Sequence, residues 1–71
     1  MSWNERLKEK RVVDALTQEE LAKMIGVSRQ HLALWESGRQ LPSPTNRRKI
    51  AEYIGKPVHE AFADLLTKEE S

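Results

Sequence analysis

The sequence contains no cysteine, so disulfide bonds and thiolate metal sites are excluded from this chain. It also has no apolar run near the roughly 18 residues that a membrane-spanning helix needs. The N-terminal stretch MSWNERLKEKR lacks the apolar core of a signal peptide. We therefore expect a protein of the cytoplasm that contacts no membrane.

Glycine and proline are scarce, at three residues each. Every glycine stands where a helix is expected to end, so there is no glycine-rich loop for a nucleotide phosphate. No serine, histidine and carboxylate have the spacing of a catalytic triad, and His31 and His59 lie 28 positions apart without further ligands. We expect no enzyme, no catalytic residue, no cofactor and no metal site.

Seventy-one residues make one small domain of ordinary soluble composition, with 38% hydrophobic and 32% charged residues. The net charge of +1 conceals an uneven distribution. Residues 1–57 carry 11 Lys and Arg against 7 Asp and Glu, whereas residues 58–71 carry 1 against 4. The basic excess suits phosphate binding, although two merely solvated clusters would give the same pattern.

The central stretch, TQEELAKMIGVSRQHLALWESG, predicts two short helices separated by one glycine. Thr17 and Glu20 have the spacing of a capping box, and Gly26 can adopt the left-handed conformation that ends a helix. The first helix should span about Gln18–Ile25, and Ser28 is the expected cap of the second, over about residues 28–37. The apolar positions that should face inward are Leu21, Ala22, Ile25, Leu32 and Trp35.

Two helices joined by so short a turn cross steeply, which leaves the first residues of the second helix exposed. An α-helix fits the major groove of DNA, where Arg can donate two hydrogen bonds to guanine and Gln can pair with adenine. Arg29 and Gln30 stand at that position. The alternative is a helical hairpin inside a small bundle, with both side chains simply solvated.

Three further helices are expected, over Trp3–Val13, over Pro44–Ile54 with Ser43 as its cap, and over Pro57–Leu66. In the first, Leu7 should face the core together with Val12 or Val13, and its end near Asp14 and Ala15 is undecided. The last helix has apolar residues at i, i+3, i+4, i+7 and i+8, of which Phe62, Leu65 and Leu66 are candidates for a dimer contact. Residues 67–71 should form a frayed polar tail.

Three motifs closely resemble the Cro/repressor-type (Xre-like) helix-turn-helix family of phage and bacterial regulators. They are Thr17–Ala22 (TQEELA), Gly26–Ser28 (GVS) and Trp35–Arg39 (WESGR) followed by Leu41 and Pro42, and the likeness extends over Glu5–Phe62. The resemblance implies an all-α, five-helix, lambda-repressor-like domain over residues 1–66 that binds operator DNA, usually as a dimer.

The resemblance also implies roles for individual residues. Arg11 should form a partly buried ion pair with Glu36, while Gln18 and Arg39 should contact phosphates. The remaining candidates are Ser28 and His31 for the DNA backbone and Leu34 for bases. Arg47 and Arg48 depart from the leucines usual in the family, and they would either contact phosphates outside the core half-site or form a merely solvated patch. Leu34 is apolar where relatives often have a polar residue, so it would contact either a thymine methyl or a neighbouring protein.

The leading hypothesis is a sequence-specific transcriptional regulator, a repressor, that binds a pseudo-palindromic operator as a homodimer in the nucleoid. The chain leaves no room for a ligand-sensing domain, so we expect regulation by abundance, proteolysis or a partner such as an antirepressor. The alternative is an antitoxin or a phage or mobile-element adaptor that binds a partner protein through the last helix.

Overall fold

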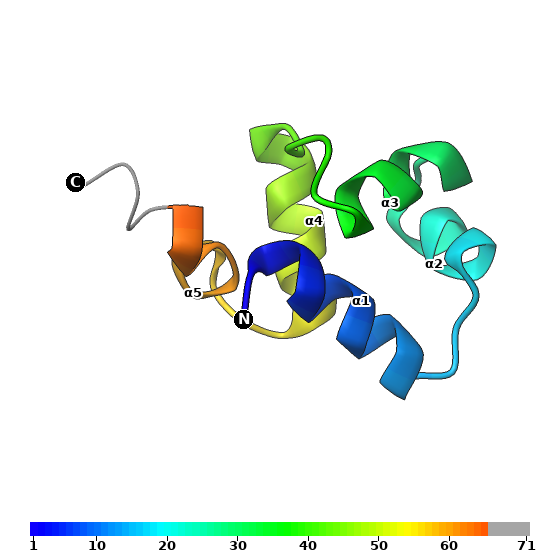
Figure 1. The fold of residues 1–71 in the computed structure, drawn as a ribbon, viewed down its shortest axis with the longest axis horizontal. Coiled ribbons are helices and arrows are strands. Elements are labelled where there is room, and N and C mark those ends of the chain that lie inside the picture. The colour runs from blue at the N-terminus through cyan, green and yellow to red at the C-terminus, as the bar shows by residue number, and fades with distance from the viewer. Residues whose placement is uncertain (66–71) are drawn as a thin grey trace.

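The computed structural model describes residues 1–65, and this part of the chain is all-helical (Figure 1). The helices are α1 (Trp3–Val13), α2 (Gln18–Ile25), α3 (Arg29–Glu36), α4 (Pro44–Ile54) and α5 (Val58–Ala61). The predicted all-α class is therefore confirmed. The bounds of α1, α2 and α4 agree with the sequence prediction, and α3 lies between its two predicted terminal serines, which serve as its caps.

The first two helices begin with reciprocal capping boxes. The hydroxyl groups of Ser2 and Thr17 accept the backbone N–H of Glu5 and Glu20 at 3.4 and 3.0 Å. Each glutamate returns the contact by accepting the backbone N–H of its cap residue, at 3.0 and 2.9 Å. These backbone hydrogen bonds, helped by the cap hydroxyls, hold the pKa of both glutamates below the ordinary value.

The core is assembled from all five helices around six large, fully buried side chains: Trp35, Phe62, Leu7, Leu21, Leu32 and Ile50. Helix α1 and helix α4 occupy the middle, with α2 and α3 at one end and α5 at the other (Figure 1). The rings of Trp3 and Phe62 lie 5.5 Å apart. Arg6 adds a hydrogen bond to the carbonyl of Ala61 at 2.9 Å, so α1 holds α5 in place.

The prediction that Val12 or Val13 faces the core is wrong, because they are 59% and 74% exposed. Leu7 is fully buried together with Trp3, one helical turn earlier. The inner face of α1 then continues one turn later onto the half-buried Arg11, which shares the i, i+4 spacing. The two valines lie beyond that face.

Helix α1 ends at Val13 with Asp14 as its C-cap, and Ala15 then adopts the left-handed backbone conformation (φ 57°) although it is not a glycine. The backbone N–H of Leu16 donates to the carbonyl of Arg11 at 3.0 Å and closes the helix. Asp14, the residue before Ala15, has two side-chain partners. Its carboxylate accepts the hydroxyl of Tyr53 on α4 at 2.8 Å and contacts the Lys10 ammonium at 3.1 Å.

Helix α5 is shorter than predicted, because Phe62 leaves the helical conformation (φ −116°, ψ 31°) before residues 63–65 turn helical again. The proposal of Phe62 as a dimer contact is wrong, since its ring is packed in the core and only 2% exposed. Leu65 is half-buried against the same core. Leu66 and the tail at 67–71 lie outside the described residues.

Candidate nucleic-acid interface

The turn between α2 and α3 is built from the residues that the sequence motif predicted. Gly26 ends α2 in the left-handed conformation (φ 89°), and Val27 packs partly buried against the core. Ser28 then caps α3 by accepting the backbone N–H of His31 at 3.2 Å. This short connection fixes the direction in which α3 leaves α2.

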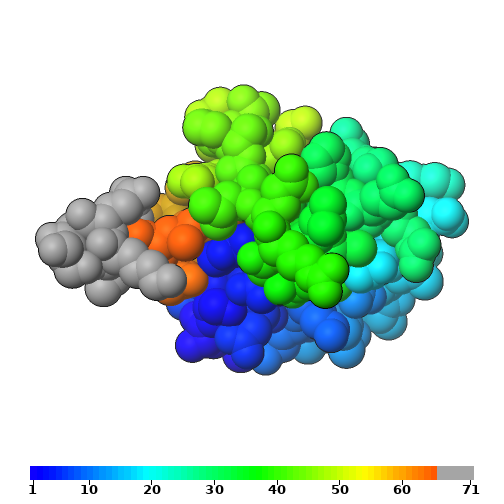
Figure 2. Space-filling model, turned by 45° about the horizontal axis from the view of Figure 1, so that its top comes forward, coloured from blue at the N-terminus to red at the C-terminus, as the bar shows by residue number. Residues whose placement is uncertain are grey.

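Helix α3 buries one face and exposes the other. Leu32 and Trp35 are at most 1% exposed and anchor the helix to α1 and α2. Outside that buried face, Arg29, Gln30, His31 and Leu34 are exposed to solvent, as is Ser28 at the start of the helix. With the loop that follows, α3 forms a continuous surface in Figure 2. All three predicted base-contacting residues, Arg29, Gln30 and Leu34, are therefore accessible.

The end of α3 is tied to α1 and α2 through Glu36, which is 7% exposed. Arg11 donates to its carboxylate from Nε at 2.6 Å and from Nη2 at 3.0 Å, so the ion pair implied by the resemblance is present. This hydrogen bonding raises the pKa of Arg11. The third nitrogen of the guanidinium donates to the carbonyl of Leu16 at 2.8 Å. Because every guanidinium nitrogen is occupied, Arg11 is a structural residue.

Gln18, the predicted phosphate contact, has an intramolecular partner. Its Nε2 donates to Glu36 Oε1 at 3.1 Å, and the side chain is half-buried. An amide nitrogen carries two hydrogens, so a second donor remains beside the N-terminus of α2. Thr17, Gln18 and Arg29 line one shallow hollow there with Arg11 and Glu19. The structure thus brings Gln18 next to Arg29 and orients it through Glu36.

The ring of His31 stacks on that of Trp35, with centroids 5.7 Å apart and an angle of 29° between the planes. Trp35 itself is buried, so the exposed imidazole covers its outer face. His31 therefore has a defined position at the start of α3, where its ring can point toward a phosphate.

The predicted phosphate-binding arginines differ in their surroundings. Within residues 1–65 neither Arg29 nor Arg39 has a side-chain hydrogen bond or an ion pair, and both are exposed. Arg48 is exposed and makes one long contact to Thr45 Oγ1, at 3.4 Å. Arg47 instead donates to the carbonyl of Pro42 at 3.1 Å and lies 5.9 Å from the ring centre of Phe62. Its role is to hold the loop before α4 against the core.

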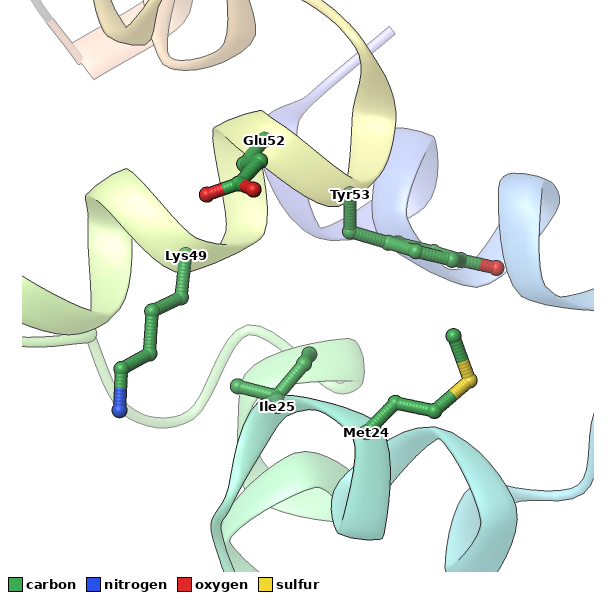
Figure 3. Close-up of a pocket in the computed structure, with 5 residues that line it drawn as sticks. All are labelled: Met24, Ile25, Lys49, Glu52 and Tyr53. Carbon is green, nitrogen blue, oxygen red and sulfur yellow. The ribbon is translucent and has the colours of Figure 1, made fainter.

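A separate hollow of about 480 Å³ lies between α2 and α4 (Figure 3). Met24 and Ile25 line it from α2, and Lys49, Glu52 and Tyr53 line it from α4. Both charged side chains in it are exposed, and the Tyr53 hydroxyl already donates to Asp14. We regard it as the open seam between two helices, since no buried polar group points into it.

Sequence reasoning missed three structural contacts. Trp3 belongs to the core, which its i, i+4 spacing to Leu7 would have indicated. Asn4 Nδ2 donates to the carbonyl of Glu36 at 3.1 Å, and Tyr53 donates to Asp14. The last two contacts join residues 32 and 39 positions apart, so no local signal exists for them.

Among the helices within residues 1–65, none has the length and apolar character needed to cross a membrane. Nor does any group of three or more His, Cys, Asp or Glu side chains within residues 1–65 have the arrangement of a metal site.

Comparison with known proteins identifies relatives among transcriptional regulators. The chain is 33% identical over 73 aligned residues to the transcriptional activator BcrR of Enterococcus faecalis, spanning all of this chain but only 36% of BcrR. It is 42% identical over 57 residues to an uncharacterized HTH-type transcriptional regulator of Methanocaldococcus jannaschii, covering 80% of this chain and 86% of that protein. Against the repressor RstR of the cryptic phage CTXphi in Vibrio cholerae, identity is 32% over 65 residues, with 92% and 59% covered.

A solved structure agrees with the sequence relatives. The restriction-modification controller protein C.AhdI of Aeromonas hydrophila superposes with a TM-score of 0.72 at 32% identity, covering 84% of this chain and 91% of that one. A family model described as helix-turn-helix matches residues 7–60, which include α2, α3 and their connection. The chain therefore belongs to the Cro/repressor-type (Xre-like) helix-turn-helix family.

Proposed function

We propose that the protein is a sequence-specific DNA-binding transcriptional regulator that inserts the start of α3 into the major groove. The supporting observation is the state of Arg29 and Gln30: both are exposed and, among the described residues, have no side-chain partner. The helix that presents them is anchored behind by Leu32 and Trp35. Free donors on a fixed helix face are what direct contact with base edges requires.

Phosphate contacts would set the position of that helix on the duplex. Arg39 follows α3 and is unpaired within residues 1–65, while Ser28 and His31 flank the helix start. Gln18 keeps a second amide hydrogen beside the N-terminus of α2. Arg48 contributes from the start of α4. Arg47 is left out of this set, because Pro42 and Phe62 already hold it.

Repression through a dimer is the form of regulation that we propose. A domain that occupies an operator can block a promoter by occupancy alone, and RstR, a relative, is named a repressor. Symmetric pairing would place two α3 helices one helical turn of DNA apart and give a pseudo-palindromic operator. Leu65, half-buried near the C-terminal end of the described chain, is the remaining described candidate for that contact.

The adaptor alternative depended on an apolar surface along α5. Ala61 and Phe62 are 0% and 2% exposed, so they pack inside the domain, whereas Val58 is 37% exposed. Within the described residues, no observation favours this function over DNA binding.

Selection of binding sites from random duplexes tests the proposal. An enriched pseudo-palindrome, footprinted at half-sites one turn apart, is expected. Arg29→Ala should lower affinity for the selected operator about 10- to 100-fold while leaving binding to random DNA nearly unchanged. Arg39→Ala should weaken both and reduce the dependence of log affinity on log salt concentration by about one unit.

Lys56→Ala is the matched control, since this residue lines a hollow with Met1, Val13 and Ile54 that includes none of the residues proposed to contact DNA. The control should bind like the wild type. Absence of any enriched sequence, or equal losses for Arg29→Ala on both DNAs, would contradict the proposal.

A further inference from the structure

Leu34 is an exception among the large apolar residues of α3. It is 39% exposed, whereas Leu32 and Trp35 on the same helix are 0% and 1% exposed. It lies one helical turn after Gln30, so the two side chains share one outward face. An apolar side chain thus lies on the surface that we propose for DNA.

Leu34 lines a hollow of about 500 Å³ together with Gln30, Ala33, Ser37 and Arg39. The Ser37 hydroxyl donates to the carbonyl of Leu34 at 3.0 Å, so its hydrogen is used within the helix. Gln30 and Arg39 have no side-chain partner among the described residues. The hollow therefore combines apolar walls from Ala33 and Leu34 with free donors on either side.

In the major groove of DNA, the apolar group at the base edges is the C5 methyl of thymine. We propose that Leu34, with Ala33, contacts a thymine methyl in each operator half-site and makes that base pair a determinant of specificity. This inference rests on the proposed function. One helical turn separates Leu34 from Gln30 by about 6 Å, which corresponds to roughly two base-pair steps. The thymine is expected within that distance of the base pair that Gln30 contacts.

Continuity with charged groups favours DNA over a protein as the occupant. The hollow is bordered by Arg39, and Arg29 is exposed nearby in the first turn of the same helix. Helix α3 and the loop that carries Arg39 form one surface (Figure 2). A polyanion satisfies both cations while its groove covers the apolar centre.

Replacement of thymine by deoxyuridine isolates the methyl group, because pairing is unchanged and only the methyl is lost. Each thymine of the selected operator is replaced in turn, symmetrically in both half-sites, and dissociation constants are measured by fluorescence anisotropy. For the wild type, one position should lower affinity about 3- to 5-fold per half-site. Leu34→Ala should bind the thymine operator and the deoxyuridine operator with equal affinity. Leu34→Met, which keeps an apolar side chain, should retain part of the preference for thymine.

Val13→Ala is the matched control, because Val13 is an exposed apolar residue outside the proposed interface, at 74% exposure. It should keep the full methyl effect. Specific binding without a sensitive thymine in the wild type, or an undiminished effect in Leu34→Ala, would overturn this inference and leave the proposed function intact. Loss of binding to a protein by Leu34→Ala with operator affinity unchanged would also overturn it. If no operator is enriched, both fail.

Discussion

Ala15 is the residue at which α1 turns toward α2, and it has a positive φ of 57°. A Cβ in this conformation costs about 1–2 kcal/mol, whereas glycine adopts it freely and loses about 0.5–1 kcal/mol in chain entropy. Ala15→Gly should therefore raise the free energy of unfolding by up to about 1 kcal/mol. Urea unfolding followed by circular dichroism measures this change, and the melting temperature should rise by several degrees.

Ala33→Gly supplies the contrast, since Ala33 lies inside α3 with helical geometry. There the same substitution should lower the free energy of unfolding by about 1 kcal/mol. If both variants lost stability, the conformation assigned to Ala15 would not be the source of strain.

Among the elements, α1 and α3 are joined by the pair between Arg11 and Glu36, with side chains 13% and 4% exposed. Arg11→Met should lower the free energy of unfolding by roughly 3 kcal/mol or more, because it leaves a buried carboxylate without its cation. Combining it with Glu36→Leu should restore much of that stability, since an apolar pair needs no compensation. Denaturant titration of both single variants and the double variant gives the coupling. A double variant no more stable than Arg11→Met would contradict this account.

Helix ends that have local signals could be predicted from the sequence. Ser2 with Glu5, Thr17 with Glu20, and Pro44 after Ser43 each identify a helix start within a few residues, and the structure has all three. The break at Phe62 has no such signal, because it accompanies packing of the ring against Trp3, far away in the sequence.

The same distinction applies to the candidate site. Exposure of Arg29 and Gln30 follows from the local helix pattern and is observed. The side-chain partner of Gln18 lies 18 residues away in the sequence. Arg47 lies over the ring of Phe62, which is also distant in the sequence. The local sequence pattern therefore could not predict the contacts of Gln18 and Arg47. The resemblance to the family predicted one long-range contact, the ion pair between Arg11 and Glu36.

For the whole molecule, Tyr53 sets an alkaline limit to stability. Burial and the hydrogen bond to Asp14 raise the pKa of Tyr53 from 10.0 to about 12. Because the folded state favours the neutral phenol, Tyr53 contributes to the free energy of unfolding. This stabilisation is complete below pH 10 and is lost as the pH rises from 10 to about 12. The wild type should lose more stability than Tyr53→Phe across this interval, in urea titrations at matched pH. Tyr53 is the one tyrosine of the chain, so phenolate absorbance reports its pKa directly.

In acid, the pH dependence of stability that comes from Asp14 has the opposite sign. The hydrogen bond from Tyr53, and to a lesser extent that from Lys10, holds the pKa of Asp14 below its ordinary value of 3.8. The stabilisation that ionised Asp14 provides is therefore complete above pH 3.8 and is lost as the pH falls below it. Tyr53→Phe should weaken that acid dependence as well. An unchanged alkaline profile in Tyr53→Phe would show that the link between α1 and α4 has no part in it.

The last residue of α3, Glu36, is held by three side chains. Asn4 donates to its backbone carbonyl, and Arg11 and Gln18 donate to its side-chain carboxylate. Because of these contacts, α3 has a fixed orientation. The orientational entropy of the helix is lost when the chain folds, before the protein meets a DNA duplex. The duplex must then supply whatever adjustment the fit requires. Bendable base steps that no side chain touches would consequently help decide which sequences are accepted.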